Sequence, residues 1–147
     1  MNTTKFNTAE VGIESNHRAA VRNTITAKHG VILVADDQAP LREFIATTLR
    51  AHGYEAIVAA DGLEALELWA NAFEDTRLIV TDINMPCVNG PDLVSRIWSI
   101  FPHLPVIYIS GDDNHAAARE HVRTRRAQFI LKPFGAGEFL AAVAAVF

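Results

Sequence analysis

Three carboxylates, one hydroxyl and one ammonium group stand at the ends of short apolar runs in this sequence: Asp36, Asp37, Asp82, Ser110 and Lys132. If those runs are parallel strands of one sheet, their carboxyl ends meet at one edge, and the five side chains converge there. Three clustered carboxylates repel one another and raise one another's pKa values unless a cation compensates them. Hard oxygen ligands suit Mg²⁺. The sequence therefore predicts a Mg²⁺ site beside a lysine.

A divalent cation and a lysine around a carboxylate suit the chemistry of a phosphoryl group. The oxygens of a phosphoryl group in transfer carry charge that must be neutralised, and the attacking and leaving atoms must be aligned. A carboxylate without another duty in such a site is a candidate nucleophile, which would form an acyl phosphate. The residues alone thus favour phosphoryl transfer to an aspartate.

The elements that must position these groups alternate regularly from Gly30 onward. Apolar runs typical of strands buried on both faces are expected at 31–35, 54–60, 78–82, 105–110 and 128–131. Helices are expected at about 38–53, 62–73, 91–101, 112–125 and 137–147. This alternation predicts an α/β fold with a doubly wound, five-stranded parallel sheet and five helices.

Two of these helices have notable apolar patterns. The helix at 62–73 is expected to bury a face formed by Leu63, Leu66, Ala70 and Phe73. The segment 139–147 contains no polar residue, so it cannot bury one apolar face and expose a polar one. We interpret this last helix as a contact surface for a partner or a second copy, or as the end of a truncated chain.

Composition and charge narrow the class of protein. The chain has 147 residues, of which 50% are hydrophobic and 20% charged, and this fits one globular domain. Its longest apolar stretch, at 139–147, is far below the ~20 residues of a membrane span. The N-terminus lacks an apolar signal segment, and the single cysteine, Cys87, excludes an internal disulfide. We expect a cytoplasmic protein with no membrane association.

The charges divide the chain into two parts. Residues 1–29 carry four basic and two acidic residues, whereas residues 30–147 carry nine basic and fifteen acidic ones. We expect 1–29 to be an N-terminal extension, partly disordered or with a short helix around 15–23, and 30–147 to be the domain. An acidic body of this kind is a poor nucleic-acid binder, so no direct DNA binding is expected.

The sequence resembles the receiver domains of response regulators, in particular the chemotaxis-type single-domain regulators. The matching motifs follow the family's order and spacing on successive strands and cover roughly residues 30–147, with no match in the extension. They are VILVADDQAPLR (31–42), ADGLEAL (60–66), TDINMP (81–86), NG (89–90), ISG (109–111) and LKPF (131–134). The resemblance implies the flavodoxin-like (βα)5 receiver fold. Since the chain ends at the fifth helix, a stand-alone receiver domain is expected.

The resemblance also implies residue roles at the predicted site. Asp82 matches the phosphoacceptor. Asp36 and Asp37 match the acidic pair that holds Mg²⁺ with Asp82 and the backbone carbonyl of Asn84. Lys132 matches the lysine that contacts the phosphoryl group, and its bond to the following proline is expected to be cis.

Two further positions match the family's switch. Ser110 matches the hydroxyl residue that hydrogen-bonds the phosphoryl oxygen, and Phe129 stands where an aromatic ring rotates inward behind it. Gly111 leaves room for the donor. The implied function is Mg²⁺-dependent transfer from a phosphohistidine, on a sensor histidine kinase or a histidine phosphotransfer protein, to Asp82. The protein is then no enzyme beyond slow autodephosphorylation. Its downstream partner is expected on the fourth helix, fifth strand and fifth helix, and a homodimer is possible through the fifth helix.

Two alternatives stay open at this point. One is a small aspartate-nucleophile phosphohydrolase, although such enzymes typically carry a second acid two residues after the nucleophile, where this chain has Asn84. The other is a receiver-like binding module that is never phosphorylated. The intact set of site residues argues against it: Asp36, Asp37, Asp82, Ser110 and Lys132. A flavodoxin-like nucleotide binder lacks support, because no glycine-rich phosphate loop follows the first strand.

Overall fold

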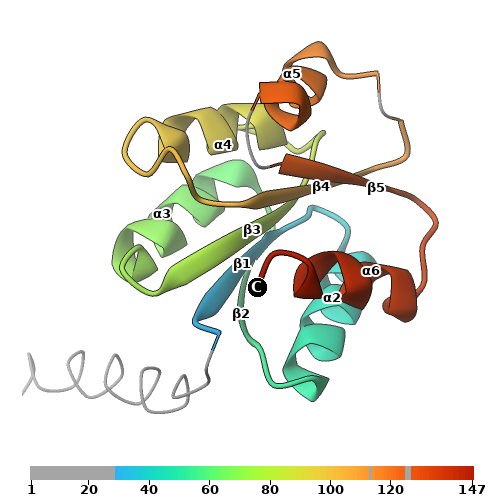
Figure 1. Cartoon of the computed structure of the whole chain (residues 1–147). Coiled ribbons are helices and arrows are strands. Elements are labelled where there is room, and N and C mark those ends of the chain that lie inside the picture. Colours follow the sequence, from blue (N-terminus) through green and yellow to red (C-terminus); the bar gives the residue numbers. More distant parts are fainter. Residues whose placement is uncertain (1–28, 113, 125–126) are drawn as a thin grey trace, which may run out of the picture.

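The computed structural model describes residues 29–112, 114–124 and 127–147, and strands and helices alternate throughout this part of the chain (Figure 1). The strands are β1 (Val31–Ala35), β2 (Glu55–Ala59), β3 (Thr76–Asp82), β4 (Val106–Ser110) and β5 (Ala127–Leu131). The helices are α2 (Ala39–Ala51), α3 (Gly62–Ala72), α4 (Gly90–Trp98), α5 (Ala116–Thr124) and α6 (Ala136–Ala144). The expected N-terminal extension, with its short helix, lies outside the described residues apart from His29.

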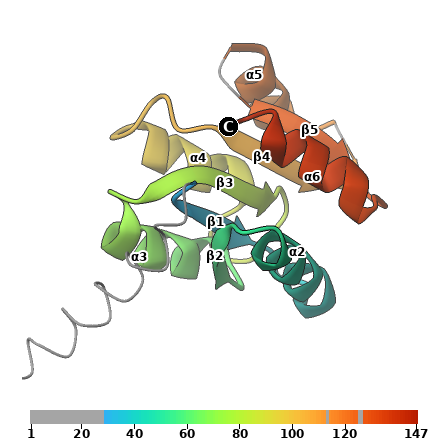
Figure 2. The same cartoon turned by 60° about the horizontal axis from the view of Figure 1, so that its bottom comes forward.

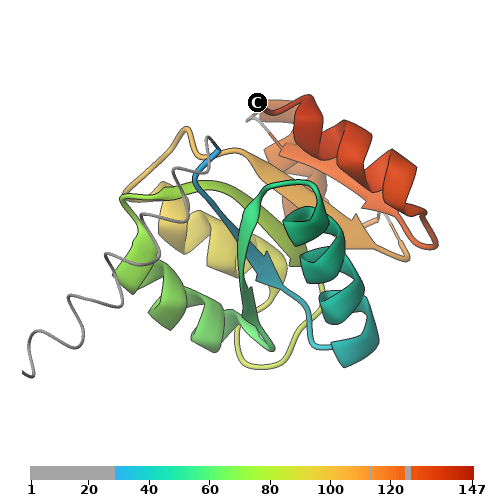
Figure 3. The ribbon, with the colours of Figure 1, turned by 90° about the horizontal axis from the view of Figure 1, so that it is seen from below.

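The five strands form one parallel sheet in the order β2-β1-β3-β4-β5. Helices α2 and α6 cover one face, and α3, α4 and α5 cover the other (Figures 2 and 3). The strand order reverses between β1 and β3, and in such sheets ligands bind beyond the carboxyl ends of the strands at this point. The predicted doubly wound α/β fold with five strands and five helices, flavodoxin-like in its strand order, is confirmed.

The central strands are buried on both faces because helices cover both. In β1, Leu33 packs into the core beneath α3 and α4, whereas Ile32 and Val34 pack into the core beneath α2 and α6. All five residues of β1 are buried, and so are those of β4. This two-sided burial explains why these strands read as continuous apolar runs rather than as alternating patterns.

Helix ends are set by local chemistry that the sequence signals well. The Asp61 carboxylate accepts a hydrogen bond from the Glu64 amide at 2.8 Å at the start of α3, and Asn89 caps α4 through the Asp92 amide in the same way. Gly53 follows α2 with φ of 88°. The differences from expectation are small: β3 starts at Thr76 rather than 78, and α5 begins at 116 rather than 112.

The buried face of α3 differs from the expected one. Leu63 is 49% and Phe73 39% exposed, and the helix instead buries Gly62, Ala65 and Trp69. Each buried residue comes one position before a residue of the expected face, so the helix is rotated about its axis relative to the prediction. Gly62 and Ala65 are small enough to let the helix approach closely, and a Cβ on Gly62 would collide with the Val88 carbonyl oxygen. Packing of small residues therefore determined the rotation of the helix, not the largest apolar stripe.

The last helix exposes small side chains rather than large ones. Phe139 and Val143 of α6 are buried against the sheet, whereas Ala141 and Ala144 are exposed. Beyond the end of the helix, Phe147 is 46% exposed. An apolar helix can thus cover the sheet without a polar face. A contact between this helix and a partner or a second copy stays a prediction. Among the described residues, no helix has the length and apolar character needed to cross a bilayer.

Candidate functional site

The carboxyl ends of the strands bring the predicted acidic residues together. Asp36 and Asp37 follow β1 directly, and Asp82 is the last residue of β3, the neighbouring strand. One carboxylate oxygen from each of the three lies within 4.8 Å of the others. The cluster therefore sits at the point where the strand order reverses, as expected. We refer to Asp36, Asp37, Asp82 and Lys132 as the acidic site.

Both carboxylate oxygens of Asp82 are engaged. Oδ1 accepts a hydrogen bond from the Ile83 amide at 2.7 Å, and Oδ2 lies 3.2 Å from the ammonium nitrogen of Lys132. Lys132 Nζ also donates to Gln38 Oε1 at 3.4 Å, so the ammonium group bridges the β1–α2 loop and β3. The Lys132–Pro133 peptide bond is cis, as expected. The lysine thus places a positive charge directly beside Asp82.

Asp36 is the most deeply buried of the three carboxylates, at 1% exposure. Its Oδ1 accepts a hydrogen bond from the Gln38 amide at 2.8 Å. Burial is the main cause that raises the pKa of Asp36 above its ordinary value; the Asp82 and Asp37 charges add to the rise, while the Gln38 hydrogen bond and Lys132 oppose it. Taken alone, this environment disfavours the ionised form.

The acidic site fits a hard divalent cation. Oδ2 of Asp36 is buried and has no hydrogen-bond partner in the part of the chain that the structure describes. An oxygen left without a partner beside two further carboxylates is chemically suited to ligate Mg²⁺, which prefers oxygen donors. Asp37 is exposed and offers the open side of such a site. Asn84 lies two residues after Asp82 in the following loop, and the role expected for its carbonyl stays a prediction.

The predicted switch residues lie on the adjoining strands. Ser110 ends β4, is 3% exposed, and its Oγ accepts a hydrogen bond from the Asp112 amide at 3.1 Å. Phe129 on β5 is paired in register with Tyr108 of β4, and their ring centroids lie 5.9 Å apart. The Phe129 ring is half-buried. The hydroxyl and the ring are therefore on neighbouring strands, with Tyr108 two residues before Ser110.

The loop after Asp82 is folded tightly against the site. Its backbone makes a γ-turn, in which the Val88 amide donates to the Pro86 carbonyl at 2.8 Å and Cys87 has a φ of 70°. The Gly90 amide then donates to the Ile83 carbonyl at 2.8 Å. A Cβ on Gly90 would collide with the Asp82 carbonyl oxygen, so only glycine fits there.

Sequence reasoning assigned no role to two residues that support this site. Gly90 was identified only as part of a motif, although its position at the start of a helix directly after an Asn cap was a signal of tight packing. Gln38 is part of the motif at 31–42, yet the sequence predicts no role for it, whereas in the structure its amide donates to Asp36 and its side chain binds Lys132. Side-chain contacts of that kind leave no pattern in a single sequence.

Fold and site together define an α/β domain with an acidic pocket and a lysine at the switch point of its sheet. The sequence matches the family described as response regulator receiver domain over residues 32–144, and the chain belongs to this family. The resemblance found in the sequence is thereby confirmed. Receiver domains act in two-component signalling, where they pair with histidine kinases and are typically switches rather than enzymes.

Three known proteins illustrate this relationship. The chain is 39% identical over 107 residues to the chemotaxis protein CheY1 of Helicobacter pylori, with 70% of this chain and 85% of that protein covered. It is similar in structure to the chemotaxis response regulator CheY4 of Vibrio cholerae, with a TM-score of 0.72, 26% identity, and coverage of 82% and 100%. It is also 26% identical over 122 residues to the sensor kinase CckA of Brucella abortus, covering 83% of this chain but 13% of the kinase.

Proposed function

We propose that this protein is a phosphoacceptor switch, in which Asp82 receives a phosphoryl group from a phosphohistidine in a reaction that needs Mg²⁺. The observation that carries this proposal is the placement of Asp82: its Oδ2 lies 3.2 Å from Lys132 Nζ, and its carboxylate belongs to the acidic cluster with Asp36 and Asp37. Donors of the required kind are sensor histidine kinases and histidine phosphotransfer proteins, as expected for the family.

The geometry supports Oδ2 of Asp82 as the nucleophile. Oδ1 is held by the Ile83 amide, whereas Oδ2 faces the ammonium group that can neutralise the phosphoryl oxygens. Oδ2 attacks phosphorus, the P–N bond of the donor breaks, and its electron pair stays on the imidazole nitrogen. The imidazole leaves neutral when its other nitrogen carries the proton. The product is an acyl phosphate on Asp82, which water later hydrolyses to aspartate and phosphate.

Mg²⁺ bound by Asp36, Asp37, Asp82 and the Asn84 carbonyl would supply further positive charge at the phosphoryl oxygens. Lys132 orients Asp82, the proposed acceptor. Its positive charge also reduces the repulsion between the Asp82 carboxylate and the incoming phosphoryl group. The backbone around Gly90 and Ile83 holds Asp82 in place, which limits the motion of the nucleophile.

Phosphorylation would act on the neighbouring strands through charge and hydrogen bonding. The modification adds about 1.5–2 negative charges and three acceptor oxygens. The Ser110 hydroxyl, now held by the Asp112 amide, would turn toward a phosphoryl oxygen, and the Phe129 ring would follow inward. The face formed by α5, β5 and α6 is where a downstream partner would detect the change. A homodimer through α6 and a cytoplasmic location remain part of the same proposal.

The decisive experiment is incubation of the full chain with acetyl phosphate and Mg²⁺, followed by intact-mass measurement. One added phosphoryl group is expected on the unchanged protein. No added mass is expected when EDTA replaces Mg²⁺ or in the Asp82→Asn variant. Asp61→Asn is the matched control, because asparagine can also cap α3 and the phosphoryl group should still be gained.

Two results would contradict the proposal. Retention of the added mass in Asp82→Asn would place the modification on another residue. Rapid multiple turnover of p-nitrophenyl phosphate would indicate a phosphohydrolase. If acetyl phosphate gives no product, a phosphorylated histidine phosphotransfer protein is the second donor to be tried, and failure with both donors would favour the binding module that is never phosphorylated.

A further inference from the structure

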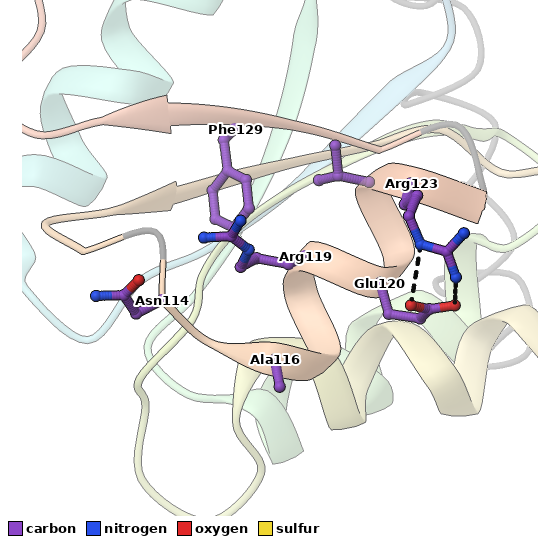
Figure 4. Close-up of a pocket in the computed structure, with 7 residues that line it drawn as sticks. Asn114, Ala116, Arg119, Glu120, Arg123 and Phe129 are labelled. Atoms are coloured by element: carbon purple, nitrogen blue, oxygen red, sulfur yellow. Dashed lines mark hydrogen bonds and ion pairs between the residues drawn. The ribbon is translucent and has the colours of Figure 1, made fainter.

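A hollow of about 790 Å³ lies between α5 and the edge strand β5, and Figure 4 shows Arg119 and Phe129 projecting into it. This hollow belongs to the face on which a downstream partner is proposed. Another hollow, of about 470 Å³, lies at the opposite end of the sheet from Asp82, where β3 and β4 begin. We refer to it as the apolar groove, and residues of two segments, 73–77 and 101–105, line it.

Three aromatic rings form a cluster at the apolar groove. Trp69 is 7% exposed, and its ring centroid lies 6.0 Å from that of Phe73 and 5.9 Å from that of Phe101. The Phe73 and Phe101 rings lie 5.7 Å apart, and each residue is 39% exposed. These two phenyl rings leave apolar surface in contact with water, and an apolar side chain placed over them would remove it.

Hydrogen bonds hold both walls of the apolar groove in place. On one side, Thr76 Oγ1 donates to the Ala72 carbonyl at 2.7 Å, which joins the end of α3 to the start of β3. On the other side, Trp98 Nε1 donates to the Leu104 carbonyl at 2.7 Å, which fixes the connection between α4 and β4. A groove with fixed walls needs little ordering when a ligand binds.

The chain enters the domain beside this groove. The Val31 amide donates to the Asp75 carbonyl at 2.8 Å. A Cβ on Gly30 would lie 2.6 Å from Cγ of Arg77, which is one of the groove residues. The part of the chain that precedes Gly30 is therefore tethered next to the groove. Val21 comes nine residues before Gly30, and such a stretch spans up to about 31 Å when extended, so its side chain can reach the groove.

The N-terminal extension and the α3 side of the groove carry complementary charges. Residues 61–75, which include α3 and its connection to β3, have five acidic residues and no basic one. Residues 15–28 have no acidic residue and three basic ones: Arg18, Arg22 and Lys28. Two large apolar residues, Val21 and Ile25, stand among these basic residues. Opposite charges of this kind favour contact between the two segments, and the apolar residues match the exposed rings of the groove.

We propose that residues 18–25 of the N-terminal extension dock in the apolar groove of their own chain. The apolar side chains of this segment cover the Phe73 and Phe101 rings, and its arginines lie toward the acidic residues of 61–75. A second copy or a free partner is disfavoured as the occupant, because a tethered segment has an effective concentration on the order of millimolar. The groove lies at the far end of the sheet from Asp82, so this docking does not rest on the proposed phosphoacceptor function.

The test is photo-cross-linking in the full chain, with Val21 replaced by p-benzoylphenylalanine. This side chain is apolar, and on irradiation it joins to C–H bonds that it contacts. An equal mixture of unlabelled and ¹⁵N-labelled chains is irradiated, and the linked tryptic peptides are identified by mass, which separates links within one chain from links between two chains. Links within one chain to 73–77 or 101–105 are expected.

Two variants of the domain show whether these links depend on the groove. Phe101→Ser removes one of its rings and is expected to lower the yield of the links about tenfold, because burial of an apolar side chain is lost. Phe44→Ser is the matched control: Phe44 is 38% exposed but lies on α2, on the other face of the sheet, so the yield should stay unchanged. Circular dichroism checks that both variants are folded.

A second measurement needs no change in the domain. In the ¹⁵N-labelled full chain, Val21→Ser/Ile25→Ser should shift the backbone amide signals of 73–77 and 101–104 and leave those of the acidic site in place. The absence of shifts at the groove would overturn the proposal, and so would an equal loss of links in Phe44→Ser.

The position of the links separates the other occupants. Links to Tyr54 or Phe147, the two rings against which His29 packs, would place the segment on the side of α2 and α6 and overturn the proposal. Links between labelled and unlabelled chains would overturn it in favour of a second copy.

Discussion

The acidic site and the exposed ion pair of α5, formed by Glu120 and Arg123, place their charges in opposite environments. Asp36 and Asp82 are 1% and 7% exposed, whereas the side chains of Arg123 and Glu120 are 72% and 53% exposed. In the buried site, each charge acts strongly on its neighbours because little water screens it. On α5, water screens the ion pair between Arg123 and Glu120, which therefore adds little to stability.

This difference separates charges on which the site and the fold depend from charges that can change at little cost to the fold. The acidic site depends on backbone positions at the ends of three strands, so a change in any one group should alter the others. Arg119 and Arg123 stand on an exposed face of α5, so a change in either side chain should cost the fold little. Four variants can break or sharpen this comparison.

The largest effect is expected from Gly90→Ala. The added Cβ collides with the backbone carbonyl of Asp82, which cannot move without displacing β3. We expect a loss of about 3 kcal/mol or more in the free energy of unfolding, measured by urea denaturation. The control is Gly137→Ala in α6, where the Cβ meets open space and stability should hold or rise by up to about 1 kcal/mol. Equal stability of both variants would show that the site tolerates backbone movement.

Lys132→Met tests the charge beside the acceptor. Removal of the ammonium group leaves Oδ2 of Asp82 without its cation and the transferring phosphoryl oxygens without neutralisation. Phosphorylation by acetyl phosphate, followed by intact mass over time, is expected to slow roughly 100-fold. Lys132→Arg keeps the charge and is expected to lose less. A rate unchanged in Lys132→Met would mean that the lysine only supports the fold.

Tyr108→Phe tests the hydrogen bond between β4 and α5, which joins Tyr108 to His121. Burial, with a contribution from the Asp92 charge, raises the pKa of Tyr108 above its ordinary value, so the phenol stays protonated, and its hydroxyl forms a hydrogen bond of 2.6 Å with Nδ1 of His121. Loss of this buried hydrogen bond is expected to cost about 1–2 kcal/mol and to speed hydrogen exchange in α5. The control, Tyr54→Phe, removes a hydroxyl from a half-buried ring and should change stability by less than about 0.5 kcal/mol. Unchanged exchange in α5 would show that other contacts hold the helix.

Asp36→Asn has the smallest expected effect on stability. Unlike the Gly90 and Tyr108 variants, it is expected to be more stable than the unchanged protein. The raised pKa of Asp36 means that the folded protein retains this proton at a pH where the unfolded chain has lost it. Its contribution to stability is therefore complete below the ordinary Asp pKa and is lost as pH rises through the folded value. In EDTA at neutral pH, Asp36→Asn should be more stable by about 1 kcal/mol and should flatten the pH dependence above pH ~4.

The same variant should weaken Mg²⁺ binding, because one carboxylate ligand is removed. Urea denaturation across pH 4 to 8, with and without Mg²⁺, measures both effects. A destabilised Asp36→Asn protein in EDTA would indicate that the ionised carboxylate supports the fold even without a cation.

The fold and most of the acidic site followed from residue types and spacing. Val31–Ala35 is apolar throughout because both faces of β1 are covered. The aspartates after β1 and at the end of β3 indicated the edge of the sheet at which parallel α/β folds bind ligands. The α3 face was predicted wrongly, since the count of large side chains favoured Leu63 and Phe73 while close packing of Gly62 and Ala65 decided the rotation.

The sequence by itself determined the α/β class, the strand ends and the chemical groups at the acidic site, because these depend on local periodicity and on the order of elements along the chain. Only the tertiary structure decided that Gln38 and Lys132 bond to each other across the site, that Gly90 lies against the Asp82 backbone, and that Tyr108 holds α5 through His121. Those contacts join residues on different elements, and their strength depends on distance and burial, which the order of residues does not specify.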